Sequence, residues 1–214
     1  MNYNLKIIHK EEYQTSSWSG GTTTQMLIFP EHSSYAVRDF AFRISSATVD
    51  LDKSEFTELK GINRYITPLD NLLRLTHNNK DFIDLQPFEV YNFSGAIPTT
   101  SYGKAKDFNL MLSEKASGNL KSVKIDKVST MTLFKENLEA GFENGFEILI
   151  SPFYDLNIKL EDKDIILSKM EEQMKFTYKL YAITLNGEEK SKVNTLEEAE
   201  ILVESTYLKF FPTS

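Results

Sequence analysis

Residues 18–25 read Trp18-Ser19-Gly20-Gly21-Thr22-Thr23-Thr24-Gln25, and residues 107–111 read Asp107-Phe108-Asn109-Leu110-Met111. The first segment is a glycine turn that leads into a hydroxyl-rich strand. The second alternates polar side chains with Phe and Leu, as a strand with one polar and one apolar face does. Both segments therefore predict strands whose polar side chains form the wall of a pocket.

Strand alternation predicts which residues share a face. After the glycines, Thr23, Gln25, Leu27 and Phe29 are expected on one face of their strand. In the segment 42–49, Arg43 and Ser45 are expected opposite Phe42 and Ile44. A solvated outer face is the common explanation of such a polar face. Arg, Ser, Asp, Asn and Met fit a partly enclosed cavity better than the Lys and Glu of a solvent face. For the glycine pair, a tight turn onto an edge strand is an equally good interpretation.

Short strand-like segments run along most of the chain. Turn residues such as Asn78-Asn79 and Asn186-Gly187 separate segments rich in aromatic and β-branched residues. The expected strands are 23–29, 40–49, 71–76, 82–85, 106–112, 146–151, 156–160, 165–168 and 176–185. Many short strands with turns between them are typical of a β-barrel or sandwich. The sequence therefore predicts an all-β fold.

Two weaker signals concern the second half. Thr195, followed by acidic residues and an apolar spacing that ends at Tyr207, predicts a short C-terminal helix. Segments 73–83 and 156–166 resemble each other, which two related barrels or a chance match of hairpins would both explain. We expect a first barrel with the pocket at 1–115, and a second barrel with the helix at 116–214.

Composition narrows the function classes. The 214 residues are 41% hydrophobic and 26% charged, as in globular proteins. A net charge of −7 disfavours nucleic acid and anionic membranes as partners. We find no signal peptide and no apolar run near the ~20 residues that span a bilayer. The absence of cysteine agrees with a cytoplasmic location, which we predict.

Side chains for metal or nucleophilic chemistry are scarce. The histidines are His9, His32 and His77, far apart in sequence, and no Gly-x-Ser-x-Gly elbow is present. We expect no metal and no other cofactor. Asp39, Glu55 and Asp107 are the carboxylates available for acid–base work if they are buried.

Arginine is used in one region only. The four arginines are Arg38, Arg43, Arg64 and Arg74, and lysine is used elsewhere. Arginine presents a planar, permanently charged fork that suits a carboxylate. This region is therefore a candidate anion site.

Several blocks in order give the chain a resemblance to the HutD/Ves family of two-barrel cupins. They are the segments 18–23, 39–49 and 56–64, then Phe93-Ser94-Gly95 and the segment 107–111. Gln25, Phe42 and Ala96 depart from the residues common in the family, and these changes bear on ligand preference. The resemblance implies a double cupin-like β-barrel without metal ligands, linked to histidine utilisation or stress response.

Together, the residues and the resemblance predict a metal-independent bicupin that binds a small anionic metabolite, such as a histidine-pathway intermediate, as a sensor or modulator. A metal-independent isomerase or hydrolase that uses Asp107 and Arg43 is the first alternative, and a protein-interaction module is the second. The oligomeric state stays open, and a homodimer is one option. The predicted ligand-binding residues are Trp18, Gly20, Gly21, Thr22, Thr23, Gln25, Arg43, Ser45, Arg64, Asp107, Asn109 and Met111.

Overall fold

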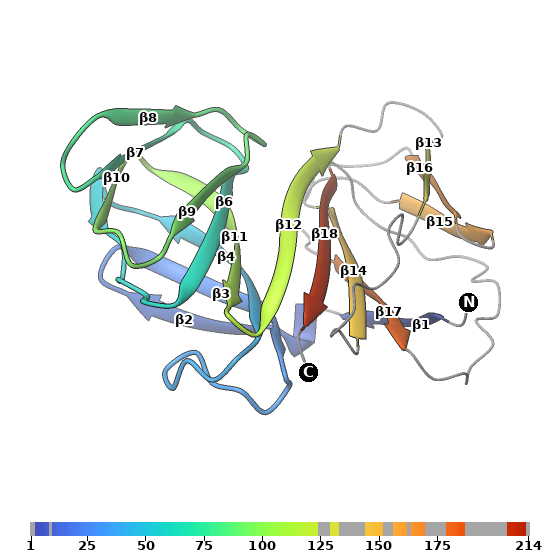
Figure 1. The fold of residues 1–214 in the computed structure, drawn as a ribbon. Coiled ribbons are helices and arrows are strands. Elements are labelled where there is room, and N and C mark those ends of the chain that lie inside the picture. The colour runs from blue at the N-terminus through green and yellow to red at the C-terminus, as the bar shows by residue number, and fades with distance from the viewer. Residues whose placement is uncertain are drawn as a thin grey trace. The chain divides into compact units, whose positions relative to one another are not determined.

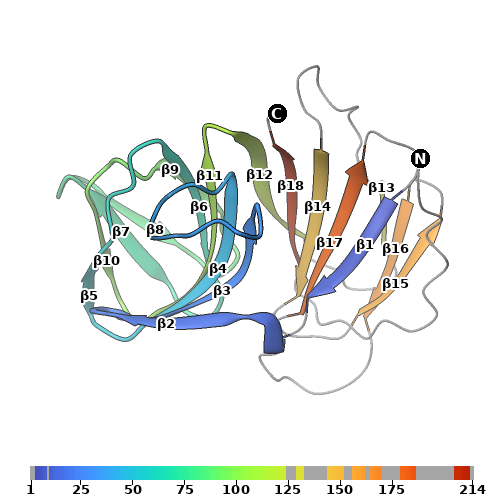
Figure 2. The same cartoon turned by 90° about the horizontal axis from the view of Figure 1, so that it is seen from below.

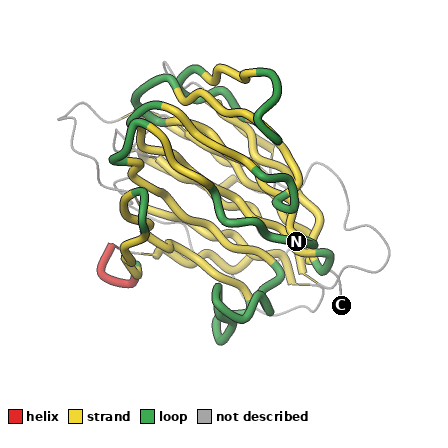
Figure 3. The backbone as a smooth tube through the Cα atoms, turned by 90° about the vertical axis from the view of Figure 1, so that its left-hand side faces the viewer, coloured by secondary structure: helices red, strands yellow, loops and turns green. Residues whose placement is uncertain are grey.

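The structure is a computed structural model, and β-strands dominate the residues that it describes (Figure 3). These residues are 3–8, 10–123, 129–132, 144–151, 156–161, 164–169, 179–186 and 205–212. Within them, the one helix is the 3-10 turn η1 (Lys10–Glu12). Each of the nine segments that the sequence predicts as strands contains a strand, although β4 and β7 begin two residues later than predicted and residues 176–178 lie outside the described residues. The all-β prediction is therefore confirmed for the described residues.

The chain divides into two compact units. One unit is Glu12–Ala116, and the other joins Met1–Glu11 to Ser117–Ser214. The N-terminal strand β1 (Tyr3–Ile8) pairs antiparallel with β17 (Lys179–Asn186), which explains why the second unit uses both ends of the sequence. The sequence-based division had placed these first residues with the first barrel.

Two antiparallel sheets build the unit Glu12–Ala116 (Figure 1). The larger sheet has the order β2-β3-β4-β11-β6-β9, and the smaller has the order β5-β10-β7-β8. The strands of the larger sheet are β2 (Gln14–Trp18), β3 (Gly21–Phe29), β4 (Phe42–Val49), β6 (Ile62–Pro68), β9 (Tyr91–Ser94) and β11 (Ala105–Ser113). Those of the smaller are β5 (Lys53–Glu55), β7 (Leu73–His77), β8 (Phe82–Leu85) and β10 (Thr99–Tyr102).

Apolar side chains from both sheets meet in a buried cluster. Ile66 of β6 and Phe93 of β9 pack with Leu73 and Leu75 of β7 and Leu85 of β8. A second cluster gathers Ile28, Phe40, Leu59, Ile62 and Met111, with Tyr35 packed against it. Burial of such side chains is worth about 1.5–3 kcal/mol each, so these clusters hold the sheets that position the site.

The second unit also contains two antiparallel sheets, of orders β1-β17-β14-β18-β12 and β13-β16-β15, and Figure 2 shows the five strands of the larger one side by side. Its remaining strands are β12 (Ala116–Val123), β13 (Ser129–Thr132), β14 (Asn144–Ser151), β15 (Leu156–Glu161), β16 (Asp164–Lys169) and β18 (Ser205–Pro212). The two segments of the weak internal repeat form the hairpins β7–β8 and β15–β16.

The predicted C-terminal helix begins at Thr195, and its residues 195–204 lie outside the described residues. Tyr207, expected at its end, lies in strand β18 and pairs with Leu149 of β14. In the described ranges, no helix is long and apolar enough to cross a membrane.

Candidate functional site

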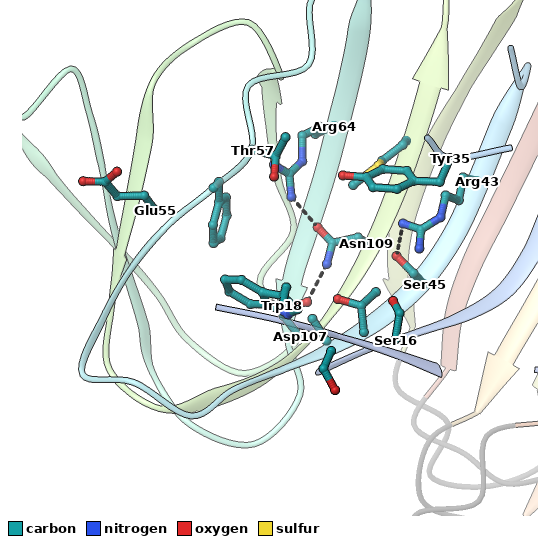
Figure 4. Close-up of a pocket in the computed structure, with 15 residues that line it drawn as sticks. Ser16, Trp18, Tyr35, Arg43, Ser45, Glu55, Thr57, Arg64, Asp107 and Asn109 are labelled. Atoms are coloured by element: carbon teal, nitrogen blue, oxygen red, sulfur yellow. Dashed lines mark hydrogen bonds between the residues drawn. The ribbon is translucent and has the colours of Figure 1, made fainter. Parts of the chain in front are cut away.

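A cavity of about 240 Å³ opens in the unit Glu12–Ala116 (Figure 4). Its polar wall comes from neighbouring strands of the larger sheet. Eight of the predicted binding residues line it: Trp18, Thr23, Arg43, Ser45, Arg64, Asp107, Asn109 and Met111. The volume lies just below the range of about 300–1,000 Å³ typical of drug-sized ligands, so it suits a small metabolite.

The register of β4 and β11 explains why four of these residues meet. Asn109 pairs with Ser45, and Met111 pairs with Arg43, so their side chains lie on the same face of the sheet. Arg43, Ser45, Asp107 and Asn109 are all buried. The polar face predicted on these strands is therefore a cavity wall and not a solvated surface.

Strand β3 departs from simple alternation. Gln25 pairs with Ser45 but Leu27 pairs with Ile44, because a bulge at Met26 inserts one extra residue. The bulge brings Ile28 opposite Arg43 and reverses the faces that follow. The prediction that Leu27 and Phe29 share the face of Thr23 and Gln25 is therefore wrong.

Gly20 lies in a turn and Gly21 begins strand β3, and neither glycine lines the cavity. Trp18 pairs with Gly21, which leaves Ser19-Gly20 as a two-residue hairpin loop between β2 and β3. A Cβ on Gly21, whose φ is +151°, would lie 1.9 Å from the carbonyl oxygen of Thr48. A Cβ on Gly20 would lie 2.2 Å from the ring of Trp18. The glycines thus allow close packing that holds Trp18 beside the cavity.

Arg64, Asn109 and Asp107 form one hydrogen-bonded chain, which Figure 4 draws as dashed lines. Arg64 Nη2 donates to Asn109 Oδ1 at 3.1 Å, and Asn109 Nδ2 donates to Asp107 Oδ1 at 2.5 Å. The Arg64 guanidinium also lies over the rings of Phe56 and Phe93, 4.8 and 5.2 Å from their centroids. An amide therefore separates the buried cation from the buried acid.

Arg43 is held by neutral partners. Its Nε donates to Gln25 Oε1 at 2.7 Å, and its Nη1 donates to Ser45 Oγ at 3.0 Å. Its guanidinium lies 4.3 Å from the ring centroid of Tyr35, which also contacts Arg38. Gln25 and Tyr35 therefore orient a charge that no carboxylate neutralises within the described part of the chain.

Two donors at the cavity have no hydrogen-bond partner. They are Trp18 Nε1 and Arg64 Nε, and both atoms are buried. A buried donor without a partner costs about 1–3 kcal/mol. Both nitrogens are out of contact with solvent, so a ligand in the cavity would reach them only after a shift of the side chain.

Burial shifts the charges of the site. It raises the pKa of the Asp107 carboxyl to about 7, although the positive charge of Arg64 opposes the rise. It lowers the pKa of Arg43 to about 10, so this group stays charged near neutral pH. Burial lowers the pKa of Arg64, and the negative charge of Asp107 offsets part of this decrease. Arginine stays protonated in proteins, so at neutral pH the cavity combines the charged Arg43 and Arg64 with an acid whose pKa lies near that pH.

Four predicted residues lie away from the cavity lining: Gly20, Gly21, Thr22 and Gln25. Seven lining residues were not predicted as ligand-binding: Ser16, Ser17, Tyr35, Ala47, Glu55, Phe56 and Thr57. Ala47 lies two residues after Ser45 on the predicted strand 40–49, so strand alternation would have found it. Ser16 and Ser17 lie on β2, which the sequence did not predict. Tyr35 lies in the loop between β3 and β4, where no periodicity applies.

Within the described ranges, no group of three His, Asp or Glu side chains is placed to hold a metal ion. His77 forms two hydrogen bonds through its ring nitrogens. Nδ1 lies 2.9 Å from Thr99 Oγ1, and Nε2 lies 3.0 Å from Tyr91 Oη. Both its ring nitrogens are thus engaged away from the cavity. That the protein works without a metal stays a prediction.

The family model of HutD matches residues 10–185. This chain belongs to the HutD family. That family is associated with histidine utilisation, so the resemblance to HutD/Ves is confirmed for the HutD branch. The match spans both structural units and extends far beyond the motif-bearing segments.

Solved structures agree on the fold. HutD from Pseudomonas fluorescens SBW25 superposes with a TM-score of 0.63 at 15% identity, with 99% of this chain and 100% of that chain covered. PA5104 from Pseudomonas aeruginosa PAO1, a conserved protein of unknown function, gives 0.61 at 14% identity with coverages of 99% and 100%. YhhW from Escherichia coli gives 0.53 at 8% identity, with coverages of 98% and 97%. The fold therefore matches bicupin structures, and comparison with curated proteins finds no match.

Proposed function

We propose that this HutD-family protein binds a small carboxylate in the cavity of the unit Glu12–Ala116 and acts as a metal-independent sensor or modulator of histidine utilisation or of a stress response. The observation that supports it most is the pair of buried guanidinium groups of Arg43 and Arg64, which bond to neutral oxygens and not to carboxylates. A buried cation without a counter-ion is costly, so an anion from outside would stabilise it.

The charged lining supports the same ligand class. Arg43 and Arg64 each bring a guanidinium group to the cavity lining. A carboxylate presents two acceptor oxygens and can bind an arginine fork in bidentate geometry. Phe56 and Met111 add apolar surface to the lining, which suits a short carbon chain or ring attached to the carboxylate.

Ligand binding can be measured directly through Trp18, since it is the one tryptophan of the chain and lines the cavity. We would titrate formate, glutarate, formylglutamate and urocanate, and follow tryptophan fluorescence with correction for absorbance by the ligand. Thermal unfolding with the same panel is the second readout. We expect at least one carboxylate to quench or shift the fluorescence and to raise the melting temperature by mass action.

A Trp18→Phe variant separates the two readouts. It removes the fluorescence signal but keeps both guanidinium groups, so the carboxylate should still raise the melting temperature, by less than in the wild type because Trp18 lines the cavity. If no carboxylate of the panel changes either readout at millimolar concentration, the proposal fails, and the interaction-module alternative takes its place.

One observation favours an enzyme as the second candidate. Asp107 is a buried carboxyl with a pKa raised to about 7 by burial, and it lies in the same cavity as two cations. General acid–base groups work best when their pKa is near the working pH. Turnover of a panel carboxylate, followed by NMR and abolished by Asp107→Asn, would move the assignment from a binding protein to an isomerase or hydrolase.

A further inference from the structure

We propose that the cavity takes up its carboxylate ligand together with one proton, and that the proton goes to the carboxyl group of Asp107. This inference rests on the proposed function, because it describes how the same cavity responds to pH. It makes the protein a sensor of two variables, the anion concentration and the pH.

Asp107 is linked to Arg64 by a chain of two hydrogen bonds. Asp107 lies in the cavity lining, and Asn109 stands between it and Arg64. Arg64 and Asp107 are joined through the Asn109 amide, so a ligand that approaches Arg64 does not first have to break an ion pair between them. A bound carboxylate would then share a small cavity with the carboxylate of Asp107. Asp107 is only 1% exposed, so water screens the repulsion between the two groups poorly.

Two carboxylates in one buried site cannot both stay ionised at low cost. The aspartate has less compensation than the ligand, because its side-chain donor is the neutral Asn109, with the backbone N–H of Ala47 as a further donor. A proton on Asp107 removes the repulsion and turns the carboxyl into a donor toward a ligand oxygen. The proton comes from solvent, and no bond of the ligand is broken.

The charged groups around Asp107 come from several elements of the unit Glu12–Ala116. Arg64 of β6 contributes positive charge, and Asp70, which follows β6, contributes negative charge. Arg43 lies on β4 in the same lining, and Glu55 of β5 lines the cavity with an exposed side chain that Figure 4 draws apart from the others. Histidine and lysine do not occur among the lining residues of this cavity. Asp107 is therefore the group best placed to accept the proton.

The affinity for the carboxylate should fall as pH rises. In the empty protein, burial raises the pKa of Asp107 to about 7, and a bound anion would raise it further. Below about pH 6 the carboxyl is already protonated, so binding takes up no proton. Above about pH 7 each binding event takes up close to one proton, and affinity falls by up to about tenfold per pH unit.

The test uses the wild-type protein with formylglutamate as the probe. Formate replaces it if formate is the panel member that binds. Neither compound has a group that titrates above about pH 5, so any proton taken up on binding goes to the protein. Isothermal titration calorimetry at about pH 7.5 in Hepes and in Tris gives the number of protons from the difference in observed heat. We expect uptake of more than half a proton per ligand at that pH and close to none at about pH 5.5.

Two variants identify the proton acceptor. Asp107→Asn should bind with an affinity that no longer depends on pH, and above neutral pH it should bind more tightly than the wild type. Glu55→Gln removes the exposed carboxylate of the lining and should keep the proton uptake. Binding without proton uptake at either pH overturns this inference and leaves the carboxylate site standing, whereas absence of binding at every pH overturns the site itself.

Discussion

Asn109 donates a hydrogen bond of 2.5 Å from its Nδ2 to Oδ1 of Asp107, and both side chains are buried. This bond fixes the orientation of the amide, because the oxygen of Asn109 must then face the donor on its other side. The bond also places a neutral group, and not a cation, against the acid. The protonation state of Asp107 is therefore set mainly by burial.

Asp107→Asn should stabilise the fold at alkaline pH. Burial raises the folded-state pKa of Asp107 above its ordinary value, so the folded state binds a proton more tightly than the unfolded state does. The stabilisation from that proton is complete below about pH 4 and is lost as pH rises through about 7. Urea unfolding at about pH 8.5 should show the variant more stable by a few kcal/mol, with the difference shrinking by about pH 5. If the free energies of unfolding of variant and wild type differed by the same amount at both pH values, the prediction would be contradicted.

Arg64→Met should weaken carboxylate binding by about 1.5–3 kcal/mol, the scale of a charge-assisted hydrogen bond. Methionine keeps much of the apolar contact with Phe56 and Phe93 but removes the charge. Arg74→Met is the matched control, since Arg74 is exposed and pairs with Asp84 outside the cavity lining. Titration of Trp18 fluorescence should separate the two variants; equal affinities for them would remove Arg64 from the site.

Gly21→Ala should destabilise the protein by more than about 1 kcal/mol. Its φ is +151°, and an added Cβ would lie 1.9 Å from the carbonyl oxygen of Thr48, so strain and a clash act together. Gly61→Ala tests strain alone, because φ is +73° there but the nearest atom to the added Cβ, on Glu114, is 3.8 Å away. Urea unfolding should rank Gly21→Ala as the more damaging change, and the reverse order would refute the packing role of Gly21.

Chelation should leave the melting temperature and carboxylate binding unchanged. The described residues offer no group of three acidic or histidine side chains for a metal, and His77 bonds to Thr99 and Tyr91 through its two ring nitrogens. Elemental analysis of protein purified without chelator is the measurement. Stoichiometric zinc, iron, manganese or nickel would contradict the metal-independent account.

Much of the fold was predictable because it depends on local patterns. The alternation on β4 and β11 places Arg43 and Asp107 on the polar face, and the turn at Asn78-Asn79 is confirmed by positive φ values of 53° and 54°. Short segments such as β5 and β10 were not predicted, since they carry little apolar periodicity.

The polar wall was predicted on β4 and β11, where the alternation is clear, whereas the strands β2 and β6 that carry Trp18 and Arg64 were not predicted. The face reversal after Gln25 was not predicted either, because a bulge at Met26 leaves no mark in an alternating pattern. Tyr35 was missed for a different reason, since a loop side chain reaches the cavity through tertiary packing against Arg38 and Arg43. Gln25 was predicted to line the cavity but does not. It accepts a hydrogen bond from Arg43 and so orients a residue that does line it.

The central claim is that the cavity selects a carboxylate through Arg43 and Arg64. The most direct measurement is calorimetric titration of the wild-type protein with the panel carboxylate that binds best and, in parallel, with its neutral carboxamide of the same shape. We predict that the carboxylate binds at least about tenfold more tightly, since the amide cannot neutralise a buried guanidinium. Equal affinity for the two compounds would contradict the account.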